Sequence, residues 1–363
     1  MPVATQGSVK ALGPDDLKHV GAQILLSNTY HLMLRPGIEV VESMGGLHNF
    51  MGWRGPILTD SGGYQTFSLG RLQRLTEEGM SFRSHIDGSE HFLSPEMCIE
   101  YQDRLGVDIA MVLDQCTPYG AQDYQLRQAL ERTHRWAVRC KEAHRRDGQA
   151  LFAIVQGGVS AELRWESAGF LIPLDFDGYA VGGLSVGEPK AEMYHTVSLM
   201  GDALPQTKPR YLMGVGSPED LVECAGLGMD LFDCALPTRV ARNGGLLTRQ
   251  GRLNVVDAAF ARQESPIDME CDCYTCQSFS AAYLHHLFRA KELLAYRLAT
   301  IHNLRFVMHL MEAMRTAIRE GRFAAFRERF LGEYRVADEE VRRVQKERWL
   351  EAQHRGEPQA DVT

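Results

Sequence analysis

The sequence contains no apolar stretch long enough to span a membrane, and its first residues, MPVATQGSVK, show no charged-then-apolar secretion signal. No internal repeat or low-complexity region interrupts it. We therefore expect a cytoplasmic protein without a membrane partner. With 363 residues and 44% hydrophobic composition, the chain is large enough to bury a sizeable core, as one large domain or two ordinary ones.

An excess of positive charge is also missing. The formal net charge is −8, which argues against general affinity for nucleic acid. Four arginines nevertheless cluster in one short stretch and indicate a local basic patch: Arg239, Arg242, Arg249 and Arg252.

The cysteines show no pattern of a secreted disulfide framework. Five of the eight are isolated in apolar or helical contexts, as reduced thiols are. Three crowd into one short segment: Cys271, Cys273 and Cys276. This spacing predicts three corners of a tetrahedral zinc site. Three histidines further along are candidates for the fourth ligand: His285, His286 and His302. Spacing alone does not choose among them, but a closed Cys3His site would be structural.

Short β-rich runs alternate with amphipathic helical stretches over the first two-thirds of the chain. The expected strands are Pro2–Thr5, Gln23–Ser27, Pro56–Thr59, Ile109–Leu113, Leu151–Val155, Gly178–Val181, Arg210–Met213 and Asp230–Phe232. The expected helices between them include 122–146, 161–170, 190–199 and 218–228, the last with Ser217 as its N-cap. This alternation predicts a parallel α/β sheet closed into a (β/α)8 TIM-like barrel. The alternative is an open doubly wound sheet, but the glycine-rich first turn of a dinucleotide fold is absent.

The alternation stops after Gly251, and the rest of the chain is different in character. An acidic, proline-containing loop leads into the cysteine segment, and helical stretches follow from Ser280 to about Gln353. We expect a catalytic barrel over residues 1–262 and a zinc-binding subdomain over 263–305. C-terminal helices over 306–356 would complete the barrel shell, and residues 357–363 would form a flexible tail.

Six consecutive strands of this pattern end in a polar side chain or in glycine, where barrel enzymes place their active sites. These ends are Asp60-Ser61-Gly62-Gly63-Tyr64, Asp114-Gln115-Cys116, Gln156-Gly157-Gly158, Gly182-Gly183-Leu184, Met213-Gly214-Val215-Gly216 and Asp233. Asp60 and Asp233 suit acid/base and nucleophilic work at a glycosidic carbon. The alternative is that each carboxylate only caps its own turn.

Three of these strand ends suggest an edge that reads a purine. The Asp114 carboxylate can accept from guanine N1–H and the exocyclic amine, while the Gln156 amide and the Gly183 N–H can serve O6. Tyr64 and Met213 could enclose a flat ring, although core packing is an equal alternative for Met213.

Longer motifs carry a resemblance to a known family. DSGGYQ, DQCTPY, QGG, GYAVGGLSVGEP, RYLMGVGSPEDL, FDCALPTRVARNG, and CDCYTC followed by YLHHL and TIHNL resemble bacterial tRNA-guanine transglycosylases. The resemblance runs from Met1 to about Tyr334. It implies a TIM-like barrel with a zinc-binding insertion that exchanges guanine at the wobble position of tRNA for preQ1, 7-aminomethyl-7-deazaguanine, a precursor of queuosine.

The resemblance also assigns roles to matching positions. It makes Asp233 the nucleophile that forms a covalent tRNA intermediate, and Asp60 the general acid/base. Base binding falls to Asp60, Ser61, Gly62, Gly63, Tyr64, Asp114, Gln156, Gly183, Leu184 and Met213. Contact with tRNA falls to Gly214, Val215, Gly216, Ser217, Pro218, Glu219, Asp220, Thr238, Arg239, Val240, Ala241 and Arg242. One structural zinc ion is bound by Cys271, Cys273, Cys276 and His302.

Partners and substrate choice follow from the same resemblance. It implies GUN anticodons, carried by the tRNAs for aspartate, asparagine, histidine and tyrosine, and a homodimer with the zinc subdomain near its interface. Cys116 and Val186 match bacterial members that take preQ1 rather than the bulkier queuine. Family members usually carry about thirty more residues before the stretch matching MPVATQG, and Gln115 stands where many have glutamate. The alternatives are a non-catalytic RNA-binding partner of the same family and a barrel glycosidase acting on sugars.

Overall fold

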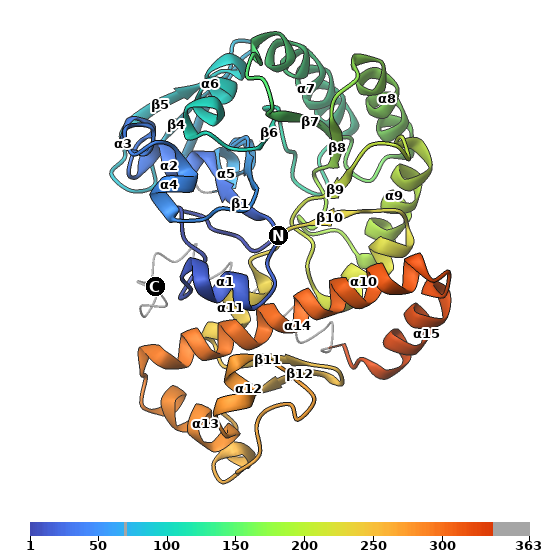
Figure 1. Ribbon diagram of the computed structural model, residues 1–363. Coiled ribbons are helices and arrows are strands. Elements are labelled where there is room, and N and C mark those ends of the chain that lie inside the picture. Colours follow the sequence, from blue (N-terminus) through green and yellow to red (C-terminus); the bar gives the residue numbers. More distant parts are fainter. Residues whose placement is uncertain (69–70, 337–363) are drawn as a thin grey trace.

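The computed structural model describes residues 1–68 and 71–336. Within these ranges, the central sheet has seven parallel strands in the order β1-β2-β6-β7-β8-β9-β10, and it curls into a half-barrel with helices outside it (Figure 1). The strands are β1 (Leu25–Asn28), β2 (Ile57–Asp60), β6 (Ile109–Met111), β7 (Ala150–Val155), β8 (Gly178–Val181), β9 (Arg210–Leu212) and β10 (Leu231–Phe232). The predicted parallel α/β architecture is confirmed.

The first expected strand, Pro2–Thr5, forms a single β-bridge. Val3 pairs in parallel with Leu26 of β1, and the Ala4 N–H donates to the Leu26 carbonyl oxygen at 2.6 Å. The Met1 nitrogen lies 2.7 Å from the Phe232 carbonyl oxygen of β10. This segment therefore lies between the first and last strands of the sheet, at the eighth position of a barrel.

The described residues form fifteen α-helices (Figure 1). They are α1 (Pro14–His19), α2 (Thr29–Leu34), α3 (Ile38–Ser43), α4 (Leu47–Met51), α5 (Gly63–Ser68), α6 (Pro95–Leu105), α7 (Asp123–Ala143), α8 (Ala161–Leu171), α9 (Lys190–Ala203), α10 (Pro218–Gly226), α11 (Leu236–Arg242), α12 (Tyr274–Ser278), α13 (Ala281–Arg289), α14 (Leu293–Arg319) and α15 (Phe323–Glu333). Helices α6 to α10 lie around the outside of the sheet, whereas α12 and α13 lie away from it, against α14. The four helices expected between strands are confirmed as α7 to α10, and Ser217 caps α10 through its side-chain oxygen. None of the described helices combines the length and apolar character needed to cross a bilayer.

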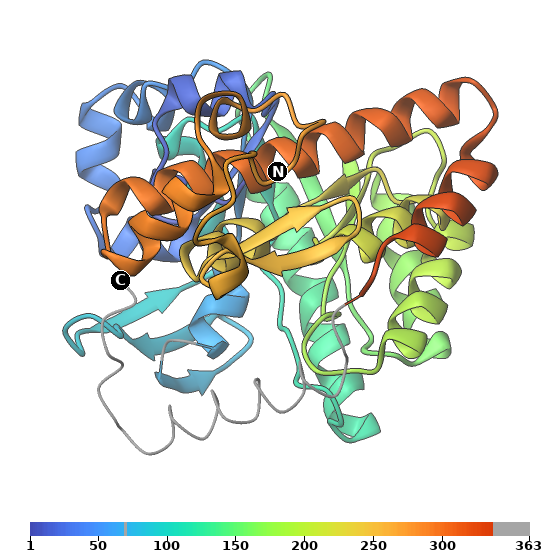
Figure 2. The same ribbon diagram turned by 90° about the horizontal axis from the view of Figure 1, so that it is seen from below.

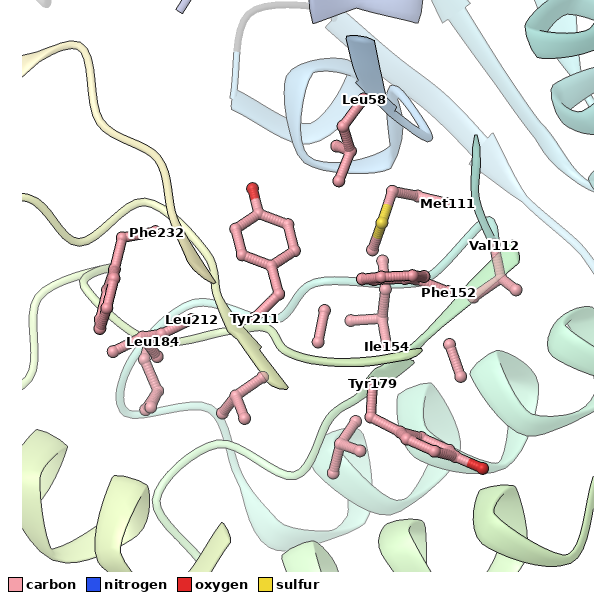
Figure 3. Close-up of a cluster of buried hydrophobic side chains, with 14 of the residues drawn as sticks. Leu58, Met111, Val112, Phe152, Ile154, Tyr179, Leu184, Tyr211, Leu212 and Phe232 are labelled. Carbon is pink, nitrogen blue, oxygen red and sulfur yellow. The ribbon is translucent and has the colours of Figure 1, made fainter. Parts of the chain in front are cut away.

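The main core lies on both faces of the sheet, inside its curl and between its outer face and the helices α7, α9 and α10. β7 and β8 are buried along almost their whole length, as expected for strands of a parallel sheet covered on both faces. Figure 3 shows the side chains of Phe152, Ile154, Tyr211 and Phe232 in this cluster, and all four are at most 4% exposed. The apolar packing below the carboxyl ends of the strands fixes the positions of the polar side chains that follow.

Carboxylates at the opposite, amino-terminal strand ends have a structural role. Asp108, Asp177 and Asp230 each precede a strand. Each accepts a hydrogen bond from a backbone N–H at or beside the start of the neighbouring strand, at 2.7, 2.9 and 2.9 Å respectively. These bonds satisfy donors that the parallel ladder leaves open. A carboxylate beside a strand can therefore have either of two roles in this fold: it caps the neighbouring strand at the amino-terminal end, or it is a candidate site residue at the carboxyl end.

Two small sheets were not expected from the sequence. β3 (Arg71–Leu75), β4 (Met80–Arg83) and β5 (Glu90–Leu93) form an antiparallel sheet between α5 and α6, and β11 (Gly245–Thr248) pairs with β12 (Gly251–Asn254). Along β4, buried residues alternate with more exposed ones, and the matching alternation of apolar and polar residue types was the sequence signal for a strand there.

The long helix α14 links the barrel to the cysteine segment. Figure 2 shows it beside the β11–β12 hairpin, and its buried face includes His302 and Asn303. The Asn303 side chain accepts from the Leu247 N–H at 2.9 Å and donates to the Pro237 and Gly245 carbonyl oxygens. The expected boundary between residues 305 and 306 falls inside this helix. The expected tail, 357–363, lies outside the described residues, as do residues 337–356.

Candidate active site

Asp60 is the last residue of β2 and lies beside Asn28, the last residue of β1, in the strand register. Its carboxylate accepts hydrogen bonds from the Asn28 side-chain amide and, at 3.1 Å, from the Thr29 N–H. Burial raises the pKa of this carboxyl to about 7, the two hydrogen bonds oppose the rise, and the negative charge of Asp233 adds to it. Asp60 can therefore both hold and release a proton near neutral pH.

Asp233 directly follows β10, at the same end of the sheet as Asp60. Its Oδ1 accepts a hydrogen bond from the Tyr211 hydroxyl at 2.5 Å and another from the Gly214 N–H at 2.8 Å. Both recorded bonds involve the same oxygen. The carboxylate is thus fixed in orientation, with Oδ2 as the oxygen left to meet a substrate.

Asp114 lies beyond β6 and is only 6% exposed. It accepts hydrogen bonds from Ser61 Oγ at 3.2 Å and from Gln156 Nε2 at 2.6 Å, and burial raises the pKa of its carboxyl. The structure therefore brings together three residues that the sequence placed at separate strand ends. Ser61 and Gln156 occupy the acceptor positions that donors of a bound base would take.

Glycines let the backbone approach these side chains closely. A Cβ atom on Gly63 would lie 2.6 Å from the Asp114 carbonyl oxygen, and one on Gly183 would lie 2.4 Å from Gln156 Oε1. Gly183 also has a φ of +67°, which favours glycine. The backbone at Gly183 therefore lies against the Gln156 side chain, which in turn contacts Asp114.

The other expected base-binding residues differ in accessibility. Tyr64 is 46% exposed and Met213 is half-buried against the core. The Tyr64 ring and the Met213 thioether can therefore both be reached from the mouth of the sheet. The Leu184 side chain is packed in the core, and only its backbone remains for a ligand. A cavity of about 390 Å³ reaches Asp114 and is lined by Gly63 and Cys116 among others. A second, of about 410 Å³, reaches Asp233 from the side of α14.

The segment Gly214–Asp220 lies next to the acids, but most of its side chains are engaged in the fold. Lys190 Nζ donates to Glu219 Oε1 at 2.9 Å and to Asp220 Oδ1 at 2.6 Å, and Ser217 caps α10. Gly214 is exposed, whereas Val215, Gly216, Ser217 and Pro218 are buried. The exposed backbone at Gly214 is the part open to a large ligand.

The second expected RNA-contacting segment forms α11, directly after Asp233. Arg239 is exposed and Arg242 is half-buried, whereas Thr238, Val240 and Ala241 face the interior. The helix therefore presents its two arginines beside the nucleophile candidate. These cations are suited to phosphate groups next to the reacting nucleotide.

The cysteine segment forms one closed cluster with a histidine of α14. Ligand atoms of Cys271, Cys273, Cys276 and His302 lie within 4.8 Å of one another, and His302 Nδ1 is 3.3 to 3.7 Å from the three sulfur atoms. His302 Nε2 donates to the Leu247 carbonyl oxygen at 2.8 Å, which leaves Nδ1 as the ligand atom. Three thiolates and one imidazole fit one structural zinc ion. The fourth ligand is thus His302, and His285 instead contacts the Val255 carbonyl oxygen.

Two residues around the acids were missed by the sequence reasoning. Asn28 ends a strand in a polar side chain, so the rule that found Asp60 would have found it as well. Tyr211 lies inside β9, between Arg210 and Leu212, and nothing in the sequence indicated its role, because its hydroxyl reaches the strand end only through the length of its ring.

Two carboxylates at the carboxyl end of a barrel-like parallel sheet, one with its pKa raised by burial to about 7, suit the class of enzyme that transfers groups at a glycosidic carbon. Comparison with known proteins narrows that class. Residues 1–336 match the family described as queuine tRNA-ribosyltransferase. A protein of that name from Dehalococcoides mccartyi is 57% identical over 357 residues, 98% of this chain and 91% of the relative. Another, from Pelotomaculum thermopropionicum, is 57% identical over 334 residues, 92% of this chain and 90% of the relative.

The chain belongs to the queuine tRNA-ribosyltransferase family. It is a tRNA-guanine transglycosylase, a pentosyltransferase whose family acts on tRNA with guanine and preQ1 as bases.

Proposed function

We propose that Asp233 is the nucleophile of this exchange. Its Oδ2 attacks the anomeric carbon of the target nucleotide, the bond to guanine breaks, and an ester-like bond joins the ribose to the enzyme. The incoming base then attacks the same carbon and releases Asp233, so two inversions give net retention. The two hydrogen bonds to Oδ1, from Tyr211 and Gly214, are the observation that carries this assignment.

Asp60 is the general acid/base in this proposal. In its neutral form it donates a proton to the departing guanine, and as a carboxylate it takes one from the incoming base. A pKa of about 7 suits both steps, because neither form is costly at neutral pH. The contacts from Asn28 and Thr29 fix its orientation throughout.

The base-recognition edge consists of Asp114, Gln156 and Gly183. A bound purine replaces Ser61 and Gln156 as donors to the Asp114 carboxylate, and the released Gln156 amide and the Gly183 N–H serve O6. Tyr64 and Met213 would enclose the ring. Because this edge is buried, the nucleotide must leave the base stack to reach it.

We propose that the anticodon loop lies over α11 and the Gly214 turn, with Arg239 and Arg242 at its phosphates. The expected targets are GUN anticodons. Cys116 and Val186, which match bacterial members that take preQ1, support preQ1 over queuine as the incoming base. A homodimer and a zinc subdomain over 263–305, which shares the helix α14 with the barrel shell, complete the proposal. The zinc site would stabilise the region that holds β11 and α14 together.

The test is exchange of radiolabelled guanine into tRNA by the purified protein alone. We expect incorporation into tRNA bearing a GUN anticodon, none when the wobble guanine is replaced, and release of the label on addition of preQ1. Incorporation that is independent of the anticodon, or an absence of release by preQ1, would overturn the substrate assignment.

A further inference from the structure

Arg164 is a fully buried arginine behind the proposed base edge. It lies in the first turn of α8, and its guanidinium donates to three backbone carbonyl oxygens: Val155 at 2.7 Å, Gly158 at 2.8 Å and Gly182 at 2.8 Å. All three recorded partners are uncharged peptide groups. Burial lowers the pKa of Arg164 to about 10, so the side chain stays cationic at neutral pH. A buried cation without a carboxylate among its recorded bonds is costly and calls for a reason.

The three carbonyls belong to the two strand ends that carry Gln156 and Gly183. Val155 ends β7 directly before Gln156, and Gly182 follows β8 directly before Gly183. The carbonyl of Gly182 and the N–H of Gly183 are two ends of one peptide unit. This peptide is trans, so the two groups point in opposite directions. A guanidinium that holds the carbonyl on one side therefore directs the N–H to the other.

The Gly183 N–H has no hydrogen-bond acceptor within the described part of the chain. The Gln156 side chain packs against the same glycine pair, and its amide reaches Asp114. Arg164 thus fixes the Gly182 carbonyl, and the N–H of the same peptide points away from Arg164. A positive charge on the carbonyl side also polarises the peptide and strengthens its N–H as a donor.

We propose that Arg164 is a positioning residue for base recognition, which locks and polarises the Gly182–Gly183 peptide so that its N–H binds the O6 atom of the purine. This inference rests on the proposed role of Gly183. Arg164 touches no substrate atom, and its effect reaches the base only through that peptide. Other residues keep the acids in place, so the chemical step itself should change less than the choice of base.

The experiment compares guanine with 6-thioguanine, in which sulfur, a weaker acceptor, replaces only O6. The KM for guanine and the inhibition constant for 6-thioguanine are measured in the exchange reaction for wild type, Arg164→Lys and Arg164→Met. The wild type should favour guanine by roughly tenfold or more, the size of one well-placed buried hydrogen bond. This preference should fall several-fold in Arg164→Met and less in Arg164→Lys, which keeps the charge, and the effect should appear in KM more than in kcat.

The matched control is Arg210→Lys. Arg210 is also buried and also donates to three carbonyl oxygens, those of Leu204, Pro205 and Gly228, but it lies at the opposite end of the sheet. Its substitution should lower stability and leave the base preference unchanged. The ratio of the KM for guanine to the inhibition constant for 6-thioguanine does not depend on the fraction of enzyme that is folded. Partial unfolding of a variant therefore does not change the measured base preference.

An unchanged preference in both Arg164 variants, or an equal change in Arg210→Lys, would overturn the positioning role. A wild type that shows no preference for guanine over 6-thioguanine would instead overturn the proposed Gly183 contact, on which this role depends. The two failures are therefore distinguishable in one set of measurements.

Discussion

The Tyr211 hydroxyl donates a hydrogen bond of 2.5 Å to Oδ1 of Asp233, from inside the core to the mouth of the sheet. Tyr211 is completely buried, and burial raises the pKa of its hydroxyl well above the usual value, with the Asp233 charge adding to the rise. The phenol therefore remains a donor at every pH at which the enzyme works. It connects the apolar core directly to the proposed nucleophile.

Tyr211→Phe should slow formation of the covalent tRNA intermediate by roughly 10- to 100-fold, because the hydroxyl holds the Asp233 carboxylate in its attacking orientation and a misplaced reacting group costs up to about 100-fold. Single-turnover trapping measures this rate. Tyr179→Phe is the matched control, since its hydroxyl donates to the Ile172 carbonyl oxygen, away from the site. Equal rates in Tyr211→Phe and wild type would remove this contact from the mechanism.

The pKa of Asp60 predicts a pH dependence of the first step. With a pKa of about 7, the neutral acid that protonates the leaving guanine disappears as pH rises through 7. The kcat/KM for tRNA should therefore fall above neutral pH in the wild type. Asp60→Asn should lose most activity and show no such inflection. An inflection at the same pH in Asp60→Asn would assign it to another group.

The raised pKa of Asp60 also predicts an effect on the stability of the fold. A folded-state pKa of about 7 against an unfolded value of 3.8 means that the native state binds the proton more tightly, so ionised Asp60 destabilises the fold above pH 7. The cost is on the order of 4 kcal/mol. Asp60→Asn should raise the free energy of unfolding most at pH 8 and progressively less toward pH 4, as measured by urea denaturation. A constant difference across this range would contradict the shifted pKa.

Asp114→Asn should weaken guanine binding, because the amide presents a donor to the two donors of the base. An unpaired buried donor costs about 1–3 kcal/mol, so the KM for guanine should rise roughly 5- to 150-fold. Asp108→Asn changes an acid beside the other end of the same strand, where it accepts from the Ile57 N–H, and should affect stability alone. Similar KM values in both variants would place Asp114 outside the base site.

The zinc cluster predicts a structural effect without direct loss of chemistry. Cys276→Ser or His302→Ala should lower the zinc content below one ion per chain and lower the Tm by several degrees, since metal binding contributes to folding. His285→Ala, which removes a contact with the Val255 carbonyl oxygen, should keep its zinc. Full zinc content in His302→Ala, measured by atomic emission, would exclude it as a ligand.

Local patterns predicted much of the fold and the site. Strand–helix alternation predicted the parallel sheet, and polar strand ends identified Asp60, Asp114 and Asp233, because parallel strands bring their carboxyl ends to one edge. The cysteine spacing predicted the metal. Each of these patterns lies within a short stretch of the chain, so it can be recognised from the sequence alone.

Other features depend on contacts between distant residues and could not be seen. The Tyr211 hydroxyl reaches Asp233 across 22 positions, and His302 joins the cysteines through the register of a long helix. Residue type alone was also ambiguous: Asp230 and Asp233 lie three positions apart, yet Asp230 accepts from the Arg210 N–H and belongs to the opposite end of the strand. The β3–β5 sheet was missed because its strands are only four or five residues long.

Trapping of the covalent intermediate with Asp233→Asn and Asp230→Asn tests the account most directly. Both acids flank β10, but only Asp233 lies at the edge that holds Asp60, so the pair separates chemistry from strand capping. Denaturing gels of enzyme with tRNA should show a shifted tRNA–enzyme band for wild type and Asp230→Asn, and none for Asp233→Asn. A shifted band of wild-type intensity with Asp233→Asn would contradict the assignment of Asp233 as the nucleophile.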